Sequence, residues 1–208
     1  MSAFNPVDRL RRSARITIAL YRISQAMNYL LRERGKVCGL SPAQIQTLLF
    51  LRYARPGVRT IGGLAERLGV SYATASGVAD ALEHKQLLQR IPSASDQRIV
   101  TLALTEQGER ESVALEDVLD EVENVVAALS DADQEALVRA TQSIIRHLQA
   151  RGYVKVYEMC WGCQFFRRNA HPDDPRGPHH CAYIDAPLPE QNTYLECPDF
   201  TPVESEGA

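Results

Sequence analysis

The chain has 208 residues, of which 45% are hydrophobic and 24% are charged. These values are typical of a globular protein, and the length allows one domain with an appendage or two small domains. No apolar run approaches the roughly 18 residues of a membrane-spanning helix, so we expect no membrane partner. Residues 1–100 carry 15 Lys or Arg and 6 Asp or Glu, whereas residues 101–208 carry 8 and 20. The basic half points to an anionic partner, although a solvated charged face gives the same imbalance.

The first part of the sequence predicts two helices. Over residues 8–34, apolar side chains recur every three or four positions, which is typical of one apolar helix face. This stripe consists of Ile16, Leu20, Ile23, Met27 and Leu30. A second helix is expected to begin after Ser41, with Pro42 in its first turn and Gln44 completing a capping box.

The next segment predicts a helix-turn-helix followed by a hairpin. A short helix over residues 61–68, a turn at Gly69 and a longer helix over residues 71–87 match the motif. Its small core would consist of Leu64, Leu68, Val70, Val78 and Leu82. Apolar runs at 87–91 and 98–104 then flank a polar loop, which indicates a β-hairpin. A hairpin in this place is a wing.

Two further helices are expected after the wing. Residues 105–130 read as one long acidic helix, and Ser130 is a capping residue for another helix that reaches about residue 150. The stripe of the acidic helix consists of Leu115, Leu119, Val122, Val126 and Leu129. Such a stripe covers either the core of its own protomer or a dimer seam, and the pattern does not separate the two.

The start of the second helix of the motif has the chemistry of a recognition helix. Ser71, Thr74 and Ser76 are small and polar, which lets the backbone approach base edges in the major groove, and Tyr72 is long enough to reach a phosphate or a base. The alternative is a capped helix start chosen for close packing.

Two arginines of the wing are the other candidate DNA ligands. Arg90 and Arg98 lie on its adjacent strands, and an arginine near a hairpin tip can enter a narrow minor groove. Asp96 is close enough in sequence to hold Arg98 or to brace the turn. The alternative for Arg98 is a solvated strand end.

The segment from Gly69 to Arg110 resembles the core of MarR-type transcriptional regulators. The resemblance extends over about residues 8–150 and is carried by Ser71, by the Asp-Gln-Arg of residues 96–98, and by Leu104, Thr105 and Gly108. It implies a homodimer that binds a pseudo-palindromic DNA operator, with the first and last helices of the region at the dimer interface. It also implies that Arg98 contacts DNA and that a small molecule or an oxidant acts as effector.

Cys38 does not fit the oxidant-sensing pattern of that family. The oxidant-sensing members carry a reactive cysteine near the start of the first helix, and this chain has none there. We interpret Cys38, in the link between the first two helices, as a small buried residue.

The four remaining cysteines predict a metal centre. Cys160, Cys163, Cys181 and Cys197 follow the spacing C-x2-C-x17-C-x15-C in a segment rich in proline and poor in aliphatic residues. We expect a DNA-binding protein to lie in the reducing cytoplasm, where such spacing indicates metal more often than disulfides. A segment of this composition needs a staple in order to fold, and a metal supplies one.

The identity of the metal stays open between zinc and iron–sulfur. Zinc is slightly favoured as the commoner structural staple, while a [2Fe–2S] or [4Fe–4S] cluster also binds four thiolates. Disulfide switching is a third option. The loop histidines His171, His179 and His180 are expected to be solvated.

The sequence therefore predicts a mainly α fold with a small β-wing. It is a winged helix-turn-helix with long dimerisation helices over residues 1–152, followed by a small metal-stapled extension over residues 153–208. The expected function is a homodimeric DNA-binding regulator, a repressor whose metal or redox centre senses a signal, and not an enzyme. The alternatives are a winged-helix adaptor with a structural zinc site, which would not need Arg90 and Arg98 beside the polar helix start, and a redox carrier without affinity for DNA.

Overall fold

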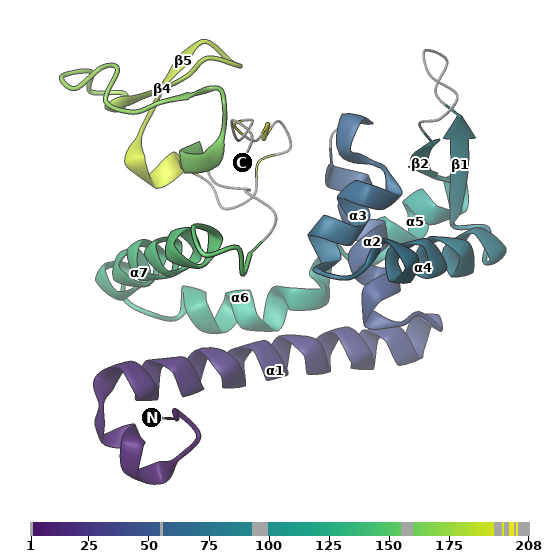
Figure 1. Ribbon diagram of the computed structural model, residues 1–208, viewed down its shortest axis with the longest axis horizontal. Coiled ribbons are helices and arrows are strands. Elements are labelled where there is room, and N and C mark those ends of the chain that lie inside the picture. The colour runs from purple at the N-terminus through teal and green to yellow at the C-terminus, as the bar shows by residue number, and fades with distance from the viewer. Residues whose placement is uncertain are drawn as a thin grey trace.

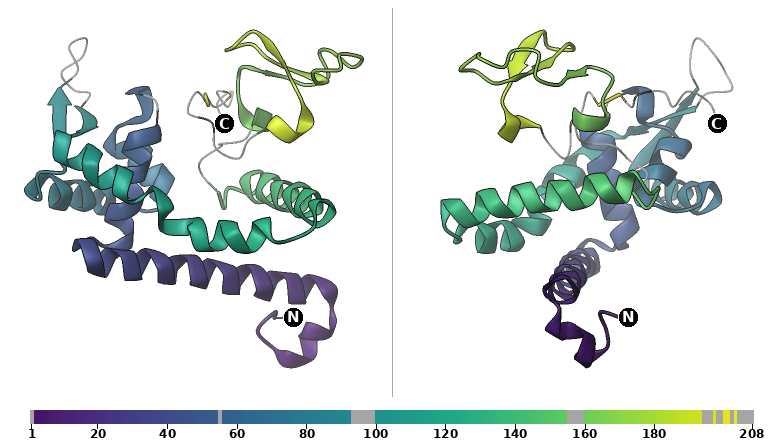
Figure 2. Two further views of the ribbon diagram at one scale, coloured as in Figure 1. Left: turned by 180° about the vertical axis from the view of Figure 1, so that it is seen from behind. Right: turned by 60° about the vertical axis from the view of Figure 1, so that its left-hand side comes forward.

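The computed structural model describes residues 2–54, 56–92, 100–154, 160–193, 197, 200, 201 and 203. The chain forms a helical part with a two-stranded wing and a C-terminal segment with a second small sheet (Figure 1). The wing and the C-terminal strands lie at opposite ends of the molecule, and the long α1 runs beneath both (Figures 1 and 2). Every helix among the described residues is too short or too polar to cross a lipid bilayer.

The elements follow one another as mostly short units joined by tight turns. The α-helices are α1 (Arg12–Cys38), α2 (Pro42–Tyr53), α3 (Ile61–Leu68), α4 (Tyr72–His84), α5 (Glu106–Ala114), α6 (Asp120–Ala127) and α7 (Asp131–Gln149). The 3-10 helices are η1 (Pro6–Leu10), η2 (Pro56–Val58), η3 (Glu116–Leu119), η4 (Cys160–Gly162) and η5 (Glu190–Asn192). The strands are β1 (Leu88–Pro92), β2 (Val100–Leu104), β3 (Phe166–Arg167), β4 (His179–Cys181) and β5 (Ala186–Leu188).

The first two helices differ from the prediction at one boundary. The helix expected to end at Arg34 continues to Cys38, and Gly39 ends it in the left-handed conformation, at φ 67°. A residue without a Cβ adopts this conformation at little cost, so the glycine sets the stop. The capping box of Ser41 and Gln44 at the start of α2 is confirmed.

The helix-turn-helix and the wing are confirmed with small shifts. α3 has the predicted bounds, but α4 ends at His84, three residues earlier than predicted, before a left-handed residue at Gln86. β1 pairs antiparallel with β2, with Leu88 opposite Leu104. Of the predicted motif core, Leu64 and Leu82 are fully buried, whereas Val70 is 38% exposed and was placed there wrongly.

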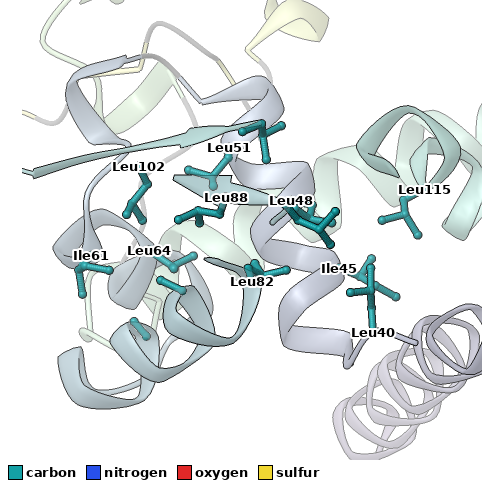
Figure 3. Packing of buried hydrophobic residues seen from close by; sticks show 14 of the residues in the cluster. Leu40, Ile45, Leu48, Leu51, Ile61, Leu64, Leu82, Leu88, Leu102 and Leu115 are labelled. Carbon is teal, nitrogen blue, oxygen red and sulfur yellow. The ribbon is translucent and has the colours of Figure 1, made fainter. Parts of the chain in front are cut away.

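One hydrophobic cluster holds the winged part together. The cluster joins residues of α1 to α4, of the wing and of the segment after α5 (Figure 3). Its members are Leu31 of α1, Leu40 just after it, Ile45, Leu48 and Leu51 of α2, Ile61, Leu64 and Ala65 of α3, Ala75, Ala79 and Leu82 of α4, Leu87, Leu88, Leu102 and Leu104 at the wing, and Leu115 and Val118 after α5. α2 lies at its centre, so the recognition helix and the wing are fixed against the same scaffold.

Gly108 allows α5 to begin directly against the wing. A Cβ built on this residue would lie 1.9 Å from the carbonyl oxygen of Leu87, which no side chain can occupy. Thr105 caps α5 by accepting a hydrogen bond from the Gly108 N–H, at 3.0 Å, and donates one to the carbonyl of Gln86, at 2.6 Å. The Leu-Thr-x-x-Gly pattern is therefore a local device that joins β2 to α5.

The single long acidic helix predicted for residues 105–130 is wrong. The structure divides it into α5, η3 and α6. At the break, the N–H of Val118 bonds to Leu115 in a 3-10 turn, and the carbonyl of Ala114 accepts a hydrogen bond from the Arg34 guanidinium instead, at 2.8 Å. A tertiary contact with α1 thus replaces a helical hydrogen bond.

Several helix faces remain exposed in the single chain. On α1 upstream of Leu31, the stripe is exposed or only half-buried, with Ile16 and Ile23 both 47% exposed. Leu119 and Leu129 of the second predicted stripe are also exposed, whereas Leu115 is buried. These stripes are therefore mostly not covered by the chain's own core.

The C-terminal segment forms an antiparallel sheet in the order β3-β4-β5. Phe166 pairs with Cys181 across β3 and β4, and Cys181 also pairs with Ala186 of β5. The rings of Trp161, Phe166 and His179 contact one another with centroids 5.0–5.6 Å apart. This aromatic group replaces the aliphatic core that the sequence lacks.

Candidate nucleic-acid interface and cysteine cluster

The N-terminal turn of α4 presents a small, polar surface. Ser71 is the N-cap: its hydroxyl accepts a hydrogen bond from the Thr74 N–H, at 3.1 Å, and lies 2.9 Å from the Thr74 hydroxyl. Tyr72 is 65% exposed, and Ser76 is half-buried. Gly77 is exposed, with nothing within 4 Å of the place where its Cβ would be. This surface lets another molecule approach the helix backbone closely.

Arg90 of the wing is already paired within the chain. Its guanidinium contacts Asp80, at 2.7 Å, and Glu83, both on α4, and its side chain is 27% exposed. These ion pairs brace β1 against the recognition helix and compete with any phosphate for the charge. Arg98 and Asp96 lie outside the described residues, so the expected groove contact of Arg98 stays a prediction.

The backbone brings the four C-terminal cysteines into one region. Cys160 and Cys163 lie on a single turn, in which the Cys163 N–H bonds to the Cys160 carbonyl at 2.9 Å. The Phe200 N–H donates a hydrogen bond to the Cys197 carbonyl, at 3.1 Å. Residues 201 and 203 then hydrogen-bond to residues 164 and 162, at 2.8 and 3.1 Å, which fixes this last stretch beside the first turn.

All four thiols are half-buried. The pKa of the Cys160 thiol is raised to about 11, mainly by burial and also by the charges of Cys197, Cys163 and Cys181. A thiol that holds its proton is a poor nucleophile, which disfavours a direct oxidation switch at Cys160. Within the described residues, no three His, Cys, Asp or Glu side chains are arranged to hold a metal ion. The cysteines are thus neighbours without a formed coordination shell.

The expectation of solvated loop histidines is wrong for His179, which is only 2% exposed. Its Nδ1 accepts a hydrogen bond from the Asn169 N–H, at 3.1 Å, and its Nε2 lies 2.5 Å from a carboxylate oxygen of Glu190. His171 and His180 are half-buried and contact each other, with Nε2 and Nδ1 3.1 Å apart. His179 therefore anchors the aromatic group.

Cys38 lies in the last turn of α1, half-buried, and its Sγ donates to the carbonyl of Arg34 at 3.2 Å. It is far along the sequence from the C-terminal cysteines and belongs to the packing of the winged part, where it lies against the main cluster. The structure thus places Cys38 inside α1 and half-buried, not buried in the link between the first two helices as predicted.

Sequence reasoning missed how the C-terminal segment contacts α7. Arg146 of α7 stacks on the ring of Trp161, with 4.9 Å from guanidinium carbon to ring centroid, and Arg168 approaches the same ring at 5.0 Å. Gln142 of α7 donates a hydrogen bond to the carbonyl of Thr193. Single polar residues on a helix do not form a periodic pattern, so the hydrophobic periodicity of the sequence does not reveal these contacts of Arg146 and Gln142.

Comparison with known proteins identifies the winged part. Residues 39–99, which contain α2, α3, α4 and β1, match the model of the MarR family. This part is similar to the MarR family. The match ends before the C-terminal cysteines and gives them no role.

The relatives of this MarR-type region are regulators. The HTH-type transcriptional repressor MdtR of Bacillus subtilis (strain 168) is 28% identical over 136 residues, which are 65% of this chain and 84% of that protein. The crystal structure of S. aureus MepR in DNA-binding conformation is 25% identical, with a TM-score of 0.57, and covers 64% of this chain and 98% of that one. The transcriptional repressor CouR, bound to a 23-mer DNA duplex, is 25% identical, with a TM-score of 0.52 over 61% and 89% of the chains.

Proposed function

We propose that this protein is a homodimeric MarR-type transcriptional repressor that binds a pseudo-palindromic DNA operator in the cytoplasm. The observation that carries the proposal is the small, polar and exposed start of α4, next to a wing that is braced on the same helix. The relatives MdtR and CouR are named as repressors, and the CouR structure is described as bound to a DNA duplex. The exposed apolar faces of α1 and α6 support a two-fold dimer, because a second copy would cover them.

In this proposal the residues of the interface have distinct roles. Tyr72, Thr74 and Ser76 reach bases or phosphates from α4, while Ser71 caps the helix and aims its positive N-terminus at the DNA backbone. Arg98 enters the groove from the wing. Arg90 holds the wing at the correct angle to α4 and contributes less contact of its own.

The test is operator binding by an Arg98→Ala variant, measured on duplexes that the wild-type protein selects from a random-sequence pool. Loss of a charged groove contact costs about 1–3 kcal/mol, so we expect affinity to fall at least ~10-fold. The wild-type affinity should also fall steeply with salt. Arg110→Ala is the matched control, since it removes an equal charge from an exposed pair with Glu106 on α5. If Arg98→Ala binds as tightly as this control, the wing does not contact DNA.

We also propose that Cys160, Cys163, Cys181 and Cys197 bind one metal centre that senses metal or redox status. Four neighbouring thiols, two of them on one tight turn, suit zinc, which is slightly favoured, or an iron–sulfur cluster. Metal binding by these four sulfur atoms would displace their thiol protons.

Metal analysis of protein purified without air tests this centre. Zinc predicts a colourless protein with about one equivalent per chain, and a cluster predicts a brown protein whose colour bleaches on oxidation. Cys163→Ser should lose the metal while the winged part stays folded, and Cys38→Ser, outside the segment, should keep it. Neither zinc nor iron near one equivalent, with the four thiols freely titratable in the folded protein, would reject the site.

A further inference from the structure

The C-terminal segment contacts one face of α7 through polar and charged side chains. Gln142 is 7% exposed and donates to the carbonyl of the fully buried Thr193, at 3.3 Å. One turn later, Arg146 stacks on Trp161. Gln149, three residues further, is 5% exposed. Steps of four and three residues keep the three α7 side chains on one face of the helix, which we call the docking face.

The docking face contacts the part of the segment closest to the cysteines. Trp161 lies between Cys160 and Cys163 in the same turn, with its ring against Arg146 and Arg168. Its indole Nε1 is buried and has no hydrogen-bond partner among the described residues, so surrounding contacts alone hold the ring. A shift of the two flanking cysteines must move this ring and, with it, the stack on α7.

The opposite side of α7 is apolar and uncovered. Leu137, Ile144 and Leu148 follow steps of seven and four residues, which place them together and away from the docking face. Leu137 and Leu148 are 39% and 37% exposed. Among the described residues, the main hydrophobic cluster includes no residue of α7, so the core of the winged part does not fix this helix. In the three views, α7 lies between α1 and the C-terminal strands (Figures 1 and 2).

We propose that α7 transmits the state of the cysteine segment to the dimer, with Arg146 and Gln142 as the coupling residues. The inference rests on the proposed sensor function and adds the path by which a signal passes from the cysteine segment to the dimer. A metal held by the cysteines that flank Trp161 would shift this ring on the docking face, and α7 would then change the position of its apolar face against the second copy. Two DNA-binding units then move relative to each other.

The experiment compares wild type, Gln142→Ala/Arg146→Ala and the control Arg139→Ala, which removes an exposed arginine of α7. Each full-length protein is purified anaerobically, and its selected-duplex affinity is measured before and after chelation of the metal. Trp161 is the only tryptophan of the chain, so its fluorescence emission reports docking directly. Arg146→Gln, which leaves Gln142 in place, serves if the double variant does not fold.

We expect metal removal to change the affinity of wild type and of Arg139→Ala by about 10-fold, within the usual range of coupling between sites. The docking variants should keep about one equivalent of metal, show red-shifted emission and lose most of this response. A docking variant that responds as fully as wild type would refute the route and leave the sensor intact. A wild-type protein without metal, or without a response to its removal, would refute the sensor and the route together.

Discussion

The exposed apolar face of α1 leads to a quantitative prediction for the dimer. Ile16 and Ile23 are each 47% exposed in the single chain. Full burial of an aliphatic side chain contributes about 1.5–3 kcal/mol, so covering the exposed half contributes about 1 kcal/mol. A two-fold interface contains each residue twice, which gives about 4 kcal/mol for complete coverage, or roughly 1,000-fold in dissociation constant. With partial coverage we expect Ile16→Gln/Ile23→Gln to weaken the dimer at least ~100-fold.

Sedimentation velocity over a range of protein concentrations measures this change. Glutamine is a good helix former, so helix content by circular dichroism should remain that of wild type. Val113→Gln on α5 is the matched control. Val113 is 50% exposed, but it lies outside α1, α6 and α7, the helices whose exposed apolar faces are proposed to meet the second copy. If the double variant dimerises as tightly as wild type, α1 is not at the interface and the reasoning from exposure is wrong.

Two further predictions concern the recognition helix and its supports. Gly108→Ala should lower the free energy of unfolding by about 1–3 kcal/mol, because the added Cβ would collide with the carbonyl of Leu87. Gly77→Ala should raise it by about 0.5–1 kcal/mol, because nothing lies near the added Cβ in α4. Thermal or denaturant unfolding measures both changes, and equal effects of the two substitutions would contradict the packing argument. Arg90→Ala should weaken operator binding less than Arg98→Ala, because Arg90 is already paired with two carboxylates on α4; a larger loss for Arg90 would mean that it leaves these partners on DNA.

Local signals explain why the winged part could be predicted. The capping pair of Ser41 and Gln44, the left-handed Gly69 and the polar start at Ser71 each fix a helix end through contacts within four residues. The sequence contains these contacts directly. The identity and order of these elements therefore follow from the sequence.

Tertiary contacts explain where the prediction was wrong. The apolar period runs unbroken from Leu115 to Leu129, but the guanidinium of Arg34 takes the carbonyl of Ala114 and the helix breaks there. Arg52 of α2 also pairs with Glu116 just after the break, at 2.5 Å. A periodic stripe records which side of a segment is apolar, and does not record a hydrogen bond donated from 80 residues away.

The place of the C-terminal segment bears on how a signal could reach DNA. Cysteine spacing predicts one metal site, and the contacts of Gln142 and Arg146 show that the segment packs on α7, a helix remote in sequence from α4. A dimeric helix-turn-helix reads two half-sites about one turn of DNA apart, so affinity depends on the spacing of its two recognition helices as much as on their own contacts. A small rotation at the dimer interface changes that spacing in both halves at once. A sensor on α7 therefore needs no contact with DNA, and its metal needs only to bind the two dimer geometries unequally.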